Sequence, residues 1–181
     1  MPARRAQERR PRRRTRSRGS VPMTQIRPAT PADVPLILRL VRELAEFERE
    51  PDAVEATEEM LEAALFGPRV TAEAVIAELD GAPAGFALFF QNFSTWTGRP
   101  GIYLEDLYVT PAARGAGVGT ALLRHLAGIA LARGCGRFEW AVLDWNEPAI
   151  NFYRAMGAVG MDEWRVQRVA GDALVKLAGG G

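Results

Sequence analysis

The chain has very little of several residues on which common classes of protein depend. Its 181 residues include one cysteine, Cys135, one histidine, His125, and one lysine, Lys176. We therefore expect no internal disulfide, no multi-cysteine metal site and no histidine-based triad. No apolar run approaches the ~20 residues that a membrane-spanning helix needs, and no hydrophobic stretch follows the first arginines as it does in a secretory signal. These absences predict a soluble, cytoplasmic protein that binds neither a metal nor a membrane.

Charge is distributed unevenly along the chain. Residues 1–22 contain nine arginines and one glutamate, about +8; because the whole chain carries +1, the remaining residues carry about −7. A basic arm can bind nucleic acid by neutralising phosphates, but this one has no aromatic residue on which a base could stack. It ends at Val21-Pro22-Met23-Thr24, where a translation start would be natural. We interpret it as a disordered and functionally inert arm, or as an extension before the true start, which makes nucleic acid an unexpected partner.

One domain of ordinary size is the expectation. A chain of this length that is 48% hydrophobic can bury one continuous core, and we place the domain at residues 23–178. A short strand at 25–27 opens it. Apolar residues then recur at helical spacing from Val34 to Phe47, and a second helix is predicted from Thr57 to Gly67.

Three acidic residues end the first predicted helix. Glu46, Glu48 and Glu50 run into Pro51, which we expect to stop the helix. Their pattern is typical of a solvated helix end, and it equally suits one wall of an acidic groove for a cationic ligand. The residues alone leave both interpretations open.

Strand-like runs fill the middle of the chain. Residues 74–79 and 84–90 are joined by Asp80-Gly81, a strong hairpin signal, and a third run covers 102–109. Alternation in this third run places Tyr103, Glu105, Leu107 and Val109 on one face and Leu104, Asp106 and Tyr108 on the other. Residues 92–101 are predicted as a loop, either a functional flap or a mobile surface connection.

The second half alternates between helices and strands. A helix at 117–133 leads to a strand at 138–143, and such a strand-helix-strand unit favours parallel pairing. Asn146 is expected to cap a short helix that ends at Gly157. Residues 164–169 and 174–177 are predicted to close the domain as a hairpin, followed by a disordered tail of glycines.

A glycine-rich segment, Arg114-Gly115-Ala116-Gly117-Val118-Gly119, separates the strand at 102–109 from the helix after it. Glycines let the backbone approach a ligand closely, and the unpaired N–H groups of a first helical turn attract anions, so this segment predicts a phosphate site. A Walker loop is excluded because Thr120-Ala121 follows in place of Lys-Ser/Thr. A dinucleotide fingerprint fits poorly because the glycines read G-x-G-x-G and no clear acidic ribose partner follows.

Arg-x-x-Gly-x-Gly after an apolar strand resembles the pyrophosphate-binding pattern of the GNAT superfamily of N-acetyltransferases. The strand Tyr103 to Val109 and the loop after it carry this resemblance, which spans about Ile26 to Ala178. The segment Asp144 to Tyr153, with its W-N-E-P-x-x-x-F-Y spacing, is similar to the diamine (spermidine/spermine) acetyltransferase branch. The expected order, β-α-α-β-β-β-α-β-α-β-β, matches the mixed-sheet α/β layout of the GNAT fold.

The resemblance implies acetyl transfer from acetyl-CoA to a primary amine of a small di- or polyamine or a lysine-like amino acid. Acetylation of a protein amino terminus or lysine is the second enzymatic interpretation, and a nucleic-acid-binding module using the arginine arm is the non-enzymatic one. The family also implies a homodimer, with Asp162 or Trp164 close to the partner's active site. Asp144 and the short segment Ala158 to Trp164 depart from the spermidine enzymes, so the substrate amine stays open.

Two residues are implied for proton transfer. An amine has a pKa near that of lysine, about 10.4, so a base must take its proton at neutral pH. Glu105 matches the family's strand-end carboxylate, which works through ordered water, and Tyr153 matches the tyrosine that protonates the leaving thiolate. The residues that would meet the cofactor are Leu107, Tyr108, Val109, Arg114, Gly115, Ala116, Gly117, Val118, Gly119, Thr120, Asn146 and Phe152. The residues that would meet the amine are Phe47, Glu48, Trp96, Glu105, Asp106, Glu139, Trp140, Ala141 and Asp162.

Overall fold

The computed structural model describes residues 23–180, so the expectations for residues 1–22 lie outside it. The described residues fall into two compact units, one ending at Glu139 and one beginning at Trp140. The prediction of one domain at 23–178 stays a prediction. Across residues 23–180, the helices are all too short or too polar to cross a membrane.

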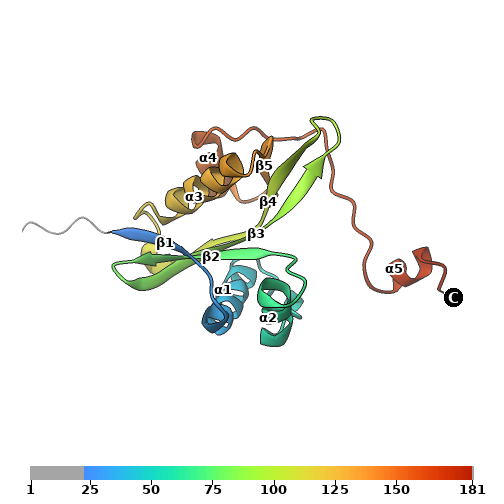
Figure 1. Ribbon diagram of the computed structural model, residues 1–181, viewed down its shortest axis with the longest axis horizontal. Helices are drawn as coiled ribbons and strands as arrows, with labels where there is room; N and C mark the ends of the chain where they lie inside the picture. The colour runs from blue at the N-terminus through green and yellow to red at the C-terminus, as the bar shows by residue number, and fades with distance from the viewer. Residues whose placement is uncertain (1–22, 181) are drawn as a thin grey trace, which may run out of the picture. The chain divides into compact units, whose positions relative to one another are not determined.

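The first unit is a twisted sheet covered by helices on both faces. Its strands β1 (Thr24–Pro28), β2 (Glu73–Leu79), β3 (Ala82–Ser94) and β4 (Arg99–Val109) form an antiparallel meander. The short β5 (Arg137–Trp140) follows β4 in the sheet, which makes the five-stranded sheet mixed. Helices α1 (Val34–Phe47) and α2 (Glu58–Phe66) cover one face, and α3 (Val118–Ala132) lies on the other (Figure 1). The expected mixed-sheet α/β class is therefore confirmed.

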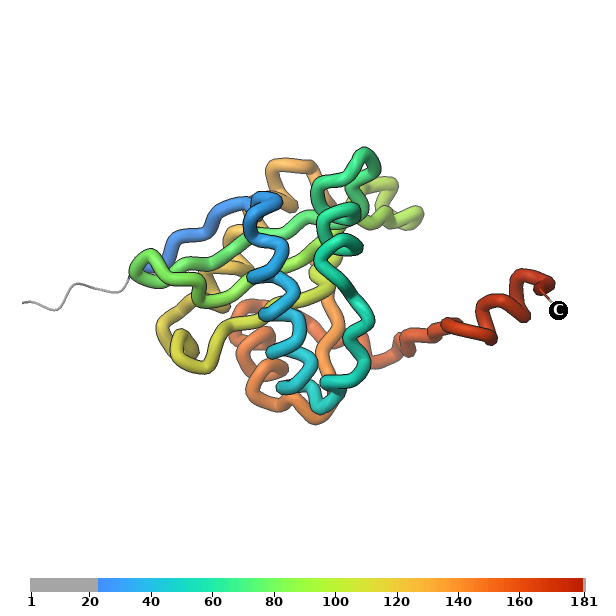
Figure 2. The backbone as a smooth tube through the Cα atoms, turned by 90° about the horizontal axis from the view of Figure 1, so that it is seen from below, coloured from blue at the N-terminus to red at the C-terminus, as the bar shows by residue number. Residues whose placement is uncertain are grey.

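The main core lies between the sheet and the pair α1 and α2, which run side by side in Figure 2. Ile37 and Leu40 of α1 are fully buried against Ile76 of β2 and Phe86 of β3. Burying each such side chain contributes about 1.5–3 kcal/mol. Tyr108 of β4 belongs to the same cluster, so this packing fixes the end of β4 relative to α1.

Local sequence signals set the helix ends. The Thr57 hydroxyl accepts a hydrogen bond from the Met60 N–H at 3.3 Å, as its N-cap position predicts. The sequence predicted that the first helix would continue to Pro51, but α1 ends earlier, at Phe47. Arg49 takes a left-handed φ of 68°, and the N–H groups of Arg49 and Glu50 bond to the Glu46 and Ala45 carbonyls. This Schellman ending fixes the direction in which the last residues of α1 point.

The predicted loop at residues 92–101 is largely wrong. Strands β3 and β4 stay paired through Ser94 and Arg99, which leaves only a short turn in which Gly98 has a φ of 64°. Each additional cross-strand pair extends the ladder, and turn signals alone do not show where a hairpin closes. Trp96 therefore lies at the tip of a long hairpin and is 88% exposed. The strand predicted at 138–143 is also shorter, since β5 ends at Trp140.

The second unit contains α4 (Glu147–Ala155) and α5 (Gly171–Leu177). Asn146 caps α4, as predicted, by accepting a hydrogen bond from the Ala149 N–H at 3.3 Å. The predicted carboxy-terminal hairpin is wrong: within the described residues 164–169 form no strand, and 171–177 are helical. Two strands without a third strand or a helix to pack against are only marginally stable, whereas Ala, Leu and Lys favour a helix. Gly179, expected in a disordered tail, ends α5 with a φ of 82°.

A partly buried ion pair ties the first strand to the start of α1. The Arg27 guanidinium donates to both carboxylate oxygens of Asp33 at 2.8 Å and to Glu78 Oε1 at 2.8 Å. Asp33 also accepts from the N–H and hydroxyl of Thr30 and is 7% exposed. These hydrogen bonds, above all those from Arg27, hold the pKa of Asp33 below its ordinary 3.8.

We expect Asp33→Asn to lower the free energy of unfolding by about 2–3 kcal/mol, because it leaves Arg27 without its main partner. An acid whose pKa is lower in the folded state stabilises the fold at any pH above its unfolded-state pKa. This stabilisation is lost as the pH falls through the folded-state pKa. The parent should therefore lose stability below about pH 4 more steeply than the variant in urea titrations. Arg39→Gln, which breaks the exposed Arg39–Glu43 pair, should change stability by less than about 0.5 kcal/mol. Equal effects of the two variants would contradict the account.

Candidate active site

A β-bulge in β4 determines which side chains face α1. Leu88 of β3 pairs with Asp106, but the next residue, Phe89, pairs with Leu104, so Glu105 is an extra residue without a partner in the ladder. Phe90 then pairs with Tyr103. Because directly paired residues share a face, Tyr103 and Asp106 lie on the same side of the sheet as Tyr108. The predicted alternation, which put Tyr103 on the face opposite Asp106, is wrong at this point.

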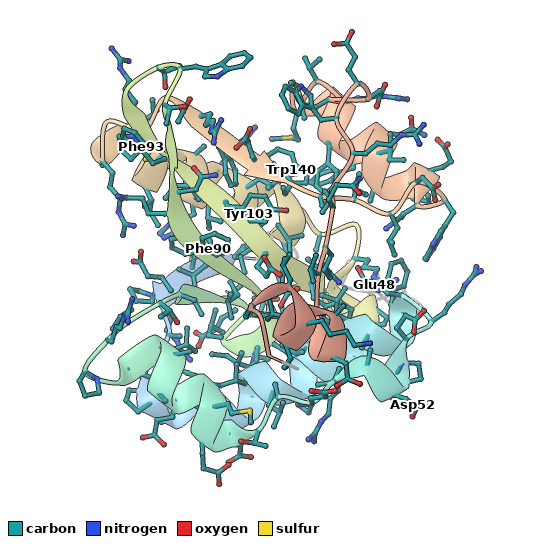
Figure 3. The ribbon with its side chains drawn as sticks, turned by 90° about the vertical axis from the view of Figure 1, so that its right-hand side faces the viewer. Glu48, Asp52, Phe90, Phe93, Tyr103 and Trp140 are labelled. Atoms are coloured by element: carbon teal, nitrogen blue, oxygen red, sulfur yellow. The ribbon has the colours of Figure 1, made fainter. Side chains whose placement is uncertain are left out.

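Three carboxylates gather around the bulge. Burial raises the pKa of Asp106 from 3.8 to about 6, and the nearby charges of Glu105 and Glu48 act in the same direction. Burial also raises the pKa of Glu48, which follows the last residue of α1 and is labelled in Figure 3. Glu105 itself is exposed. Like-charged groups with raised pKa values bind a cation favourably, because the cation offsets both the repulsion and the lost solvation.

Two aromatic rings line β3 and β4 beyond the bulge. The rings of Phe90 and Tyr103 lie 5.2 Å apart between centroids and are visible side by side in Figure 3. Neither residue was among the predicted site residues, although an aromatic pair on the face of Asp106 would suit the methylene chain of an alkylamine. The signal that was missed is the bulge, since simple alternation points Tyr103 away from Asp106.

The predicted phosphate loop has the expected backbone. Gly115 and Gly117 have φ values of 79° and 84°, and Gly117 is the N-cap of α3. Buried Val118 anchors the first turn of the helix in the core. The first backbone bond of α3 runs from Ala121 to the Gly117 carbonyl, so the N–H groups of Val118, Gly119 and Thr120 have no intrahelical acceptor. These donors and the dipole of α3 favour an anion. Ala116 and the residues on either side of it are exposed.

The Arg114 side chain contacts two aromatic rings and a backbone carbonyl. Its guanidinium carbon is 5.1 Å from the centroid of the Phe47 ring and 5.8 Å from that of Tyr108. Its Nε donates to the Val109 carbonyl at 3.2 Å. Tyr108 itself is buried in the core, so only its backbone could meet a cofactor, while Leu107 and Val109 are half-buried.

Glu139 is held by its neighbours. Its Oε2 accepts from Arg137 Nε at 2.9 Å and from Asn92 Nδ2 at 3.3 Å. The Asn92 Oδ1 is buried without a hydrogen bond, and any side chain at Gly101 would collide with it. This network links β3 to the start of β5. The predicted contact of Glu139 with an amine therefore competes with an existing ion pair, and Asn92 and Arg137 were missed because nothing local marks them.

The second unit holds the other predicted residues. The Tyr153 ring packs edge-on to Trp140, with centroids 5.1 Å apart, and lies 5.4 Å from Phe152. Asn146 uses its side chain to cap α4. Ala141 and Asp162 are exposed and lie outside helices and strands. The roles predicted for these residues stay predictions.

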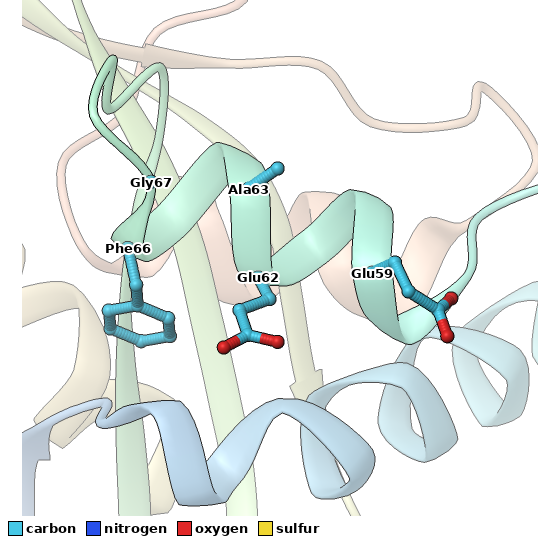
Figure 4. A pocket seen from close by; sticks show the side chains of 5 residues that line it. All are labelled: Glu59, Glu62, Ala63, Phe66 and Gly67. Carbon is cyan, nitrogen blue, oxygen red and sulfur yellow. The ribbon is translucent and has the colours of Figure 1, made fainter.

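A hollow elsewhere on the surface contains none of the predicted site residues. A shallow hollow along α2 is lined by Glu59, Glu62, Ala63, Phe66 and Gly67 (Figure 4). Among residues 23–180, no group of three or more His, Cys, Asp or Glu side chains is placed to hold a metal ion. The expectation of a metal-free reaction stays a prediction.

Comparison with known proteins gives a consistent set of relatives. The sequence pattern of the "Acetyltransferase (GNAT) family" matches residues 37–158. The thialysine N-epsilon-acetyltransferase of Mus musculus is 42% identical over 167 residues, 86% of this chain and 98% of the relative. The L-ornithine N5-acetyltransferase of Arabidopsis thaliana is 34% identical, covering 83% of this chain and 86% of its own.

Solved structures agree on the fold. An integron cassette protein from the mobile metagenome of V. cholerae superposes with a TM-score of 0.72 at 28% identity, over 86% of this chain and 97% of the other. The ribosomal-protein-alanine N-acetyltransferase from Brucella melitensis biovar Abortus superposes with a TM-score of 0.63 at 24% identity, over 82% and 99%. At that identity the second match speaks for the fold alone.

We expect the Asp106 carboxyl to titrate with a midpoint of about 6. The pKa of this acid is higher in the folded state than in the unfolded state. Between these two pKa values the folded state holds a proton that the unfolded state has lost, so the protein loses stability as the pH rises through this range. Asp106→Asn should therefore raise the melting temperature at pH 7, and Glu48→Gln should lower the Asp106 midpoint. Carboxyl NMR titration measures the second effect. A midpoint of about 4 in the parent would contradict the burial of Asp106.

Proposed function

The chain belongs to the GNAT acetyltransferase family and is an N-acetyltransferase, and from this premise we propose its donor, its substrate class and its catalytic residues. The acceptor is a primary amine of a lysine-like amino acid or a small polyamine. The observation that carries the substrate class is the set of carboxylates at the bulge, where Asp106 is half-buried near Glu48 and Glu105. A protonated amine with a second cationic group would offset their mutual repulsion.

Acetyl-CoA is the proposed donor, and it would supply an activated thioester when bound. The glycine loop fits its pyrophosphate, because the N–H groups of Val118, Gly119 and Thr120 have no intrahelical acceptor and the Cβ positions at Gly115 and Gly117 point into open space. Backbone groups of Leu107 and Val109 would pair with the pantetheine arm. Asn146 is also proposed to meet the cofactor.

Glu105 is the proposed proton acceptor. Its carboxylate is exposed on the extra residue of the bulge, where it can reach an amine directly or through one water. Asp106 would hold the ammonium group before the proton leaves. Tyr153 is the proposed acid: a phenol with a pKa of about 10 is protonated at neutral pH and matches a thiolate in basicity. Phe47, Trp96, Trp140 and Asp162 are proposed to shape the amine site.

The substrate class is tested by measuring thiol release from acetyl-CoA with a panel of amines. We expect turnover with thialysine, ornithine or spermidine. The thialysine and L-ornithine acetyltransferases are 42% and 34% identical to this chain, and a spermidine/spermine acetyltransferase-like protein is 35% identical. A peptide with a free amino terminus serves as the contrasting acceptor. Turnover with the peptide alone would replace the small-amine proposal with protein acetylation.

We also propose a homodimer that works in the cytoplasm. The single cysteine suits a reducing compartment. The segment after α4 exposes several apolar side chains, among them Val159, Met161 and Val166, which a second copy could cover. Light scattering that gives about twice the 19.8 kDa of one chain would support the dimer, and a monomer across the micromolar range would exclude it.

Gly117→Val should weaken CoA binding at least ~10-fold without unfolding the protein. Its Cβ would meet no protein atom, but a β-branched residue is strained at a φ of 84° and would stand in front of the loop amides. Gly128→Ala, inside α3 with open space around its Cβ, is the matched control and should bind CoA like the parent. Titration calorimetry measures both. Unchanged affinity in a folded Gly117→Val variant would mean that the loop is not the phosphate site.

Tyr153→Phe should lower kcat by ~10²-fold with little change in KM for acetyl-CoA, because it removes the proposed acid and keeps the ring packing against Trp140. The deficit should shrink with an acyl donor whose thiol has a much lower pKa, since that thiolate leaves without a proton. Steady-state kinetics with both donors decide the matter. A variant as fast as the parent would leave Tyr153 with a packing role.

A further inference from the structure

Arg114 opens the glycine loop but its guanidinium is turned back onto the body of the first unit. The 3-10 turn Pro111–Ala113 brings it there: Ala113 is buried and its N–H bonds to the Thr110 carbonyl at 2.9 Å. From this position the guanidinium reaches the rings of Phe47 and Tyr108 and the carbonyl of Val109. One side chain thus contacts the end of α1, the end of β4 and the start of the loop.

The Phe47 contact matters because Phe47 adjoins a residue of the acidic cluster. Phe47 is the last residue of α1, and Glu48, next to it, is the helix cap whose negative charge raises the pKa of Asp106. Arg49 closes the helix in a left-handed conformation that is costly for a residue with a side chain. A movement of the Phe47 ring would therefore displace Glu48 as well, because the closed ending of α1 leaves the two residues little independent freedom.

We infer that Arg114 is a positioning residue that couples the amine site to the CoA site through its stack on Phe47 and Tyr108. The inference rests on the proposed function, because it assigns the two ligands to the Glu48–Asp106 carboxylates and to the glycine loop. With the stack formed, Glu48 and the loop amides are held in place together; with it broken, each moves alone. A ligand at either site that favours the stacked arrangement strengthens binding at the other.

Arg114 serves this role better than lysine would. A planar guanidinium lies flat on one ring while its Nε donates in its own plane to a carbonyl, and an ammonium group offers no such face. Burial and the Glu43 carboxylate raise the pKa of Tyr108, so its hydroxyl stays neutral. The titratable and charged groups around the stack are thus Glu43, Glu48 and Arg114 itself.

The coupling is measured with CoA and amine, a pair that binds without reacting. Calorimetry gives the CoA dissociation constant without amine and with a saturating amine chosen from the substrate panel, and the ratio of the two is the coupling factor. Reciprocity requires the same factor when the amine is titrated with and without CoA. In the parent we expect a factor of about 5–10, the range of modest coupling free energies.

Phe47→Leu should bring the factor close to one, whereas Phe47→Tyr, which keeps an aromatic face, should preserve most of it. Arg114→Lys should behave like Phe47→Leu. The control is Phe93→Leu, a change at an exposed ring of the β3–β4 hairpin outside the proposed sites, which should leave the factor at the parent value.

The outcomes separate this inference from the proposed function. A parent that turns over no amine contradicts the proposed function itself. A parent that turns over an amine but shows no coupling, or a Phe47→Leu variant with the parent's factor, overturns the role of Arg114. The Arg114→Lys variant could also lose CoA affinity by the same factor with and without amine. This result would likewise overturn the coupling role, because Arg114 would then be a plain phosphate contact.

Discussion

The site depends on the β-bulge at Glu105, because one extra residue in β4 changes which side chains share a face. On the side of the bulge toward the carboxyl end of β4, Tyr108 and Asp106 face α1. On the other side of the bulge, Tyr103 faces the same way. Without the extra residue, Tyr103 would exchange places with Leu104. A bulge also bends the strand and increases its twist, and it is a common device for directing side chains in a binding site.

The residues around the bulge are packed into the core. Phe86, Phe89 and Leu104 on either side of it are almost fully buried, so a slip of one residue would expose apolar side chains on both strands. In return, Asp106 is kept in a half-buried position where ionisation is unfavourable without a cation. The stability of the core is thus what maintains an electrostatically unfavourable group, as is typical of binding sites.

Different parts of the site were predictable to different degrees. The strained backbone of the loop was predicted at Gly115 and Gly117, because a positive φ is a local requirement that only glycine meets easily. The caps at Thr57 and Asn146 were also predicted, because a side chain that accepts a hydrogen bond from the first helical turn is likewise a local signal. The position of Tyr103 was not, because a bulge depends on packing between two strands and leaves no local sequence pattern.

The errors in the fold have a similar origin. The long hairpin around Trp96 was read as a loop, since the point at which two strands stop pairing depends on both of them. The carboxy-terminal hairpin was predicted from composition, but a strand needs a neighbour, and residues 171–177 form a helix instead. The contact of Arg114 with Phe47 was also not predicted, because it joins distant segments and local sequence does not reveal it.

The central claim is that the bulge gives Asp106 and Glu105 different tasks, the first holding the amine and the second taking its proton. Steady-state kinetics on Asp106→Asn and Glu105→Gln, with amine varied at saturating acetyl-CoA, test this division directly. The account predicts that Asp106→Asn raises KM for the amine by about tenfold or more, the loss of one charge-assisted contact, while Glu105→Gln lowers kcat with little change in KM. An Asp106→Asn variant with the parent's KM would contradict the account.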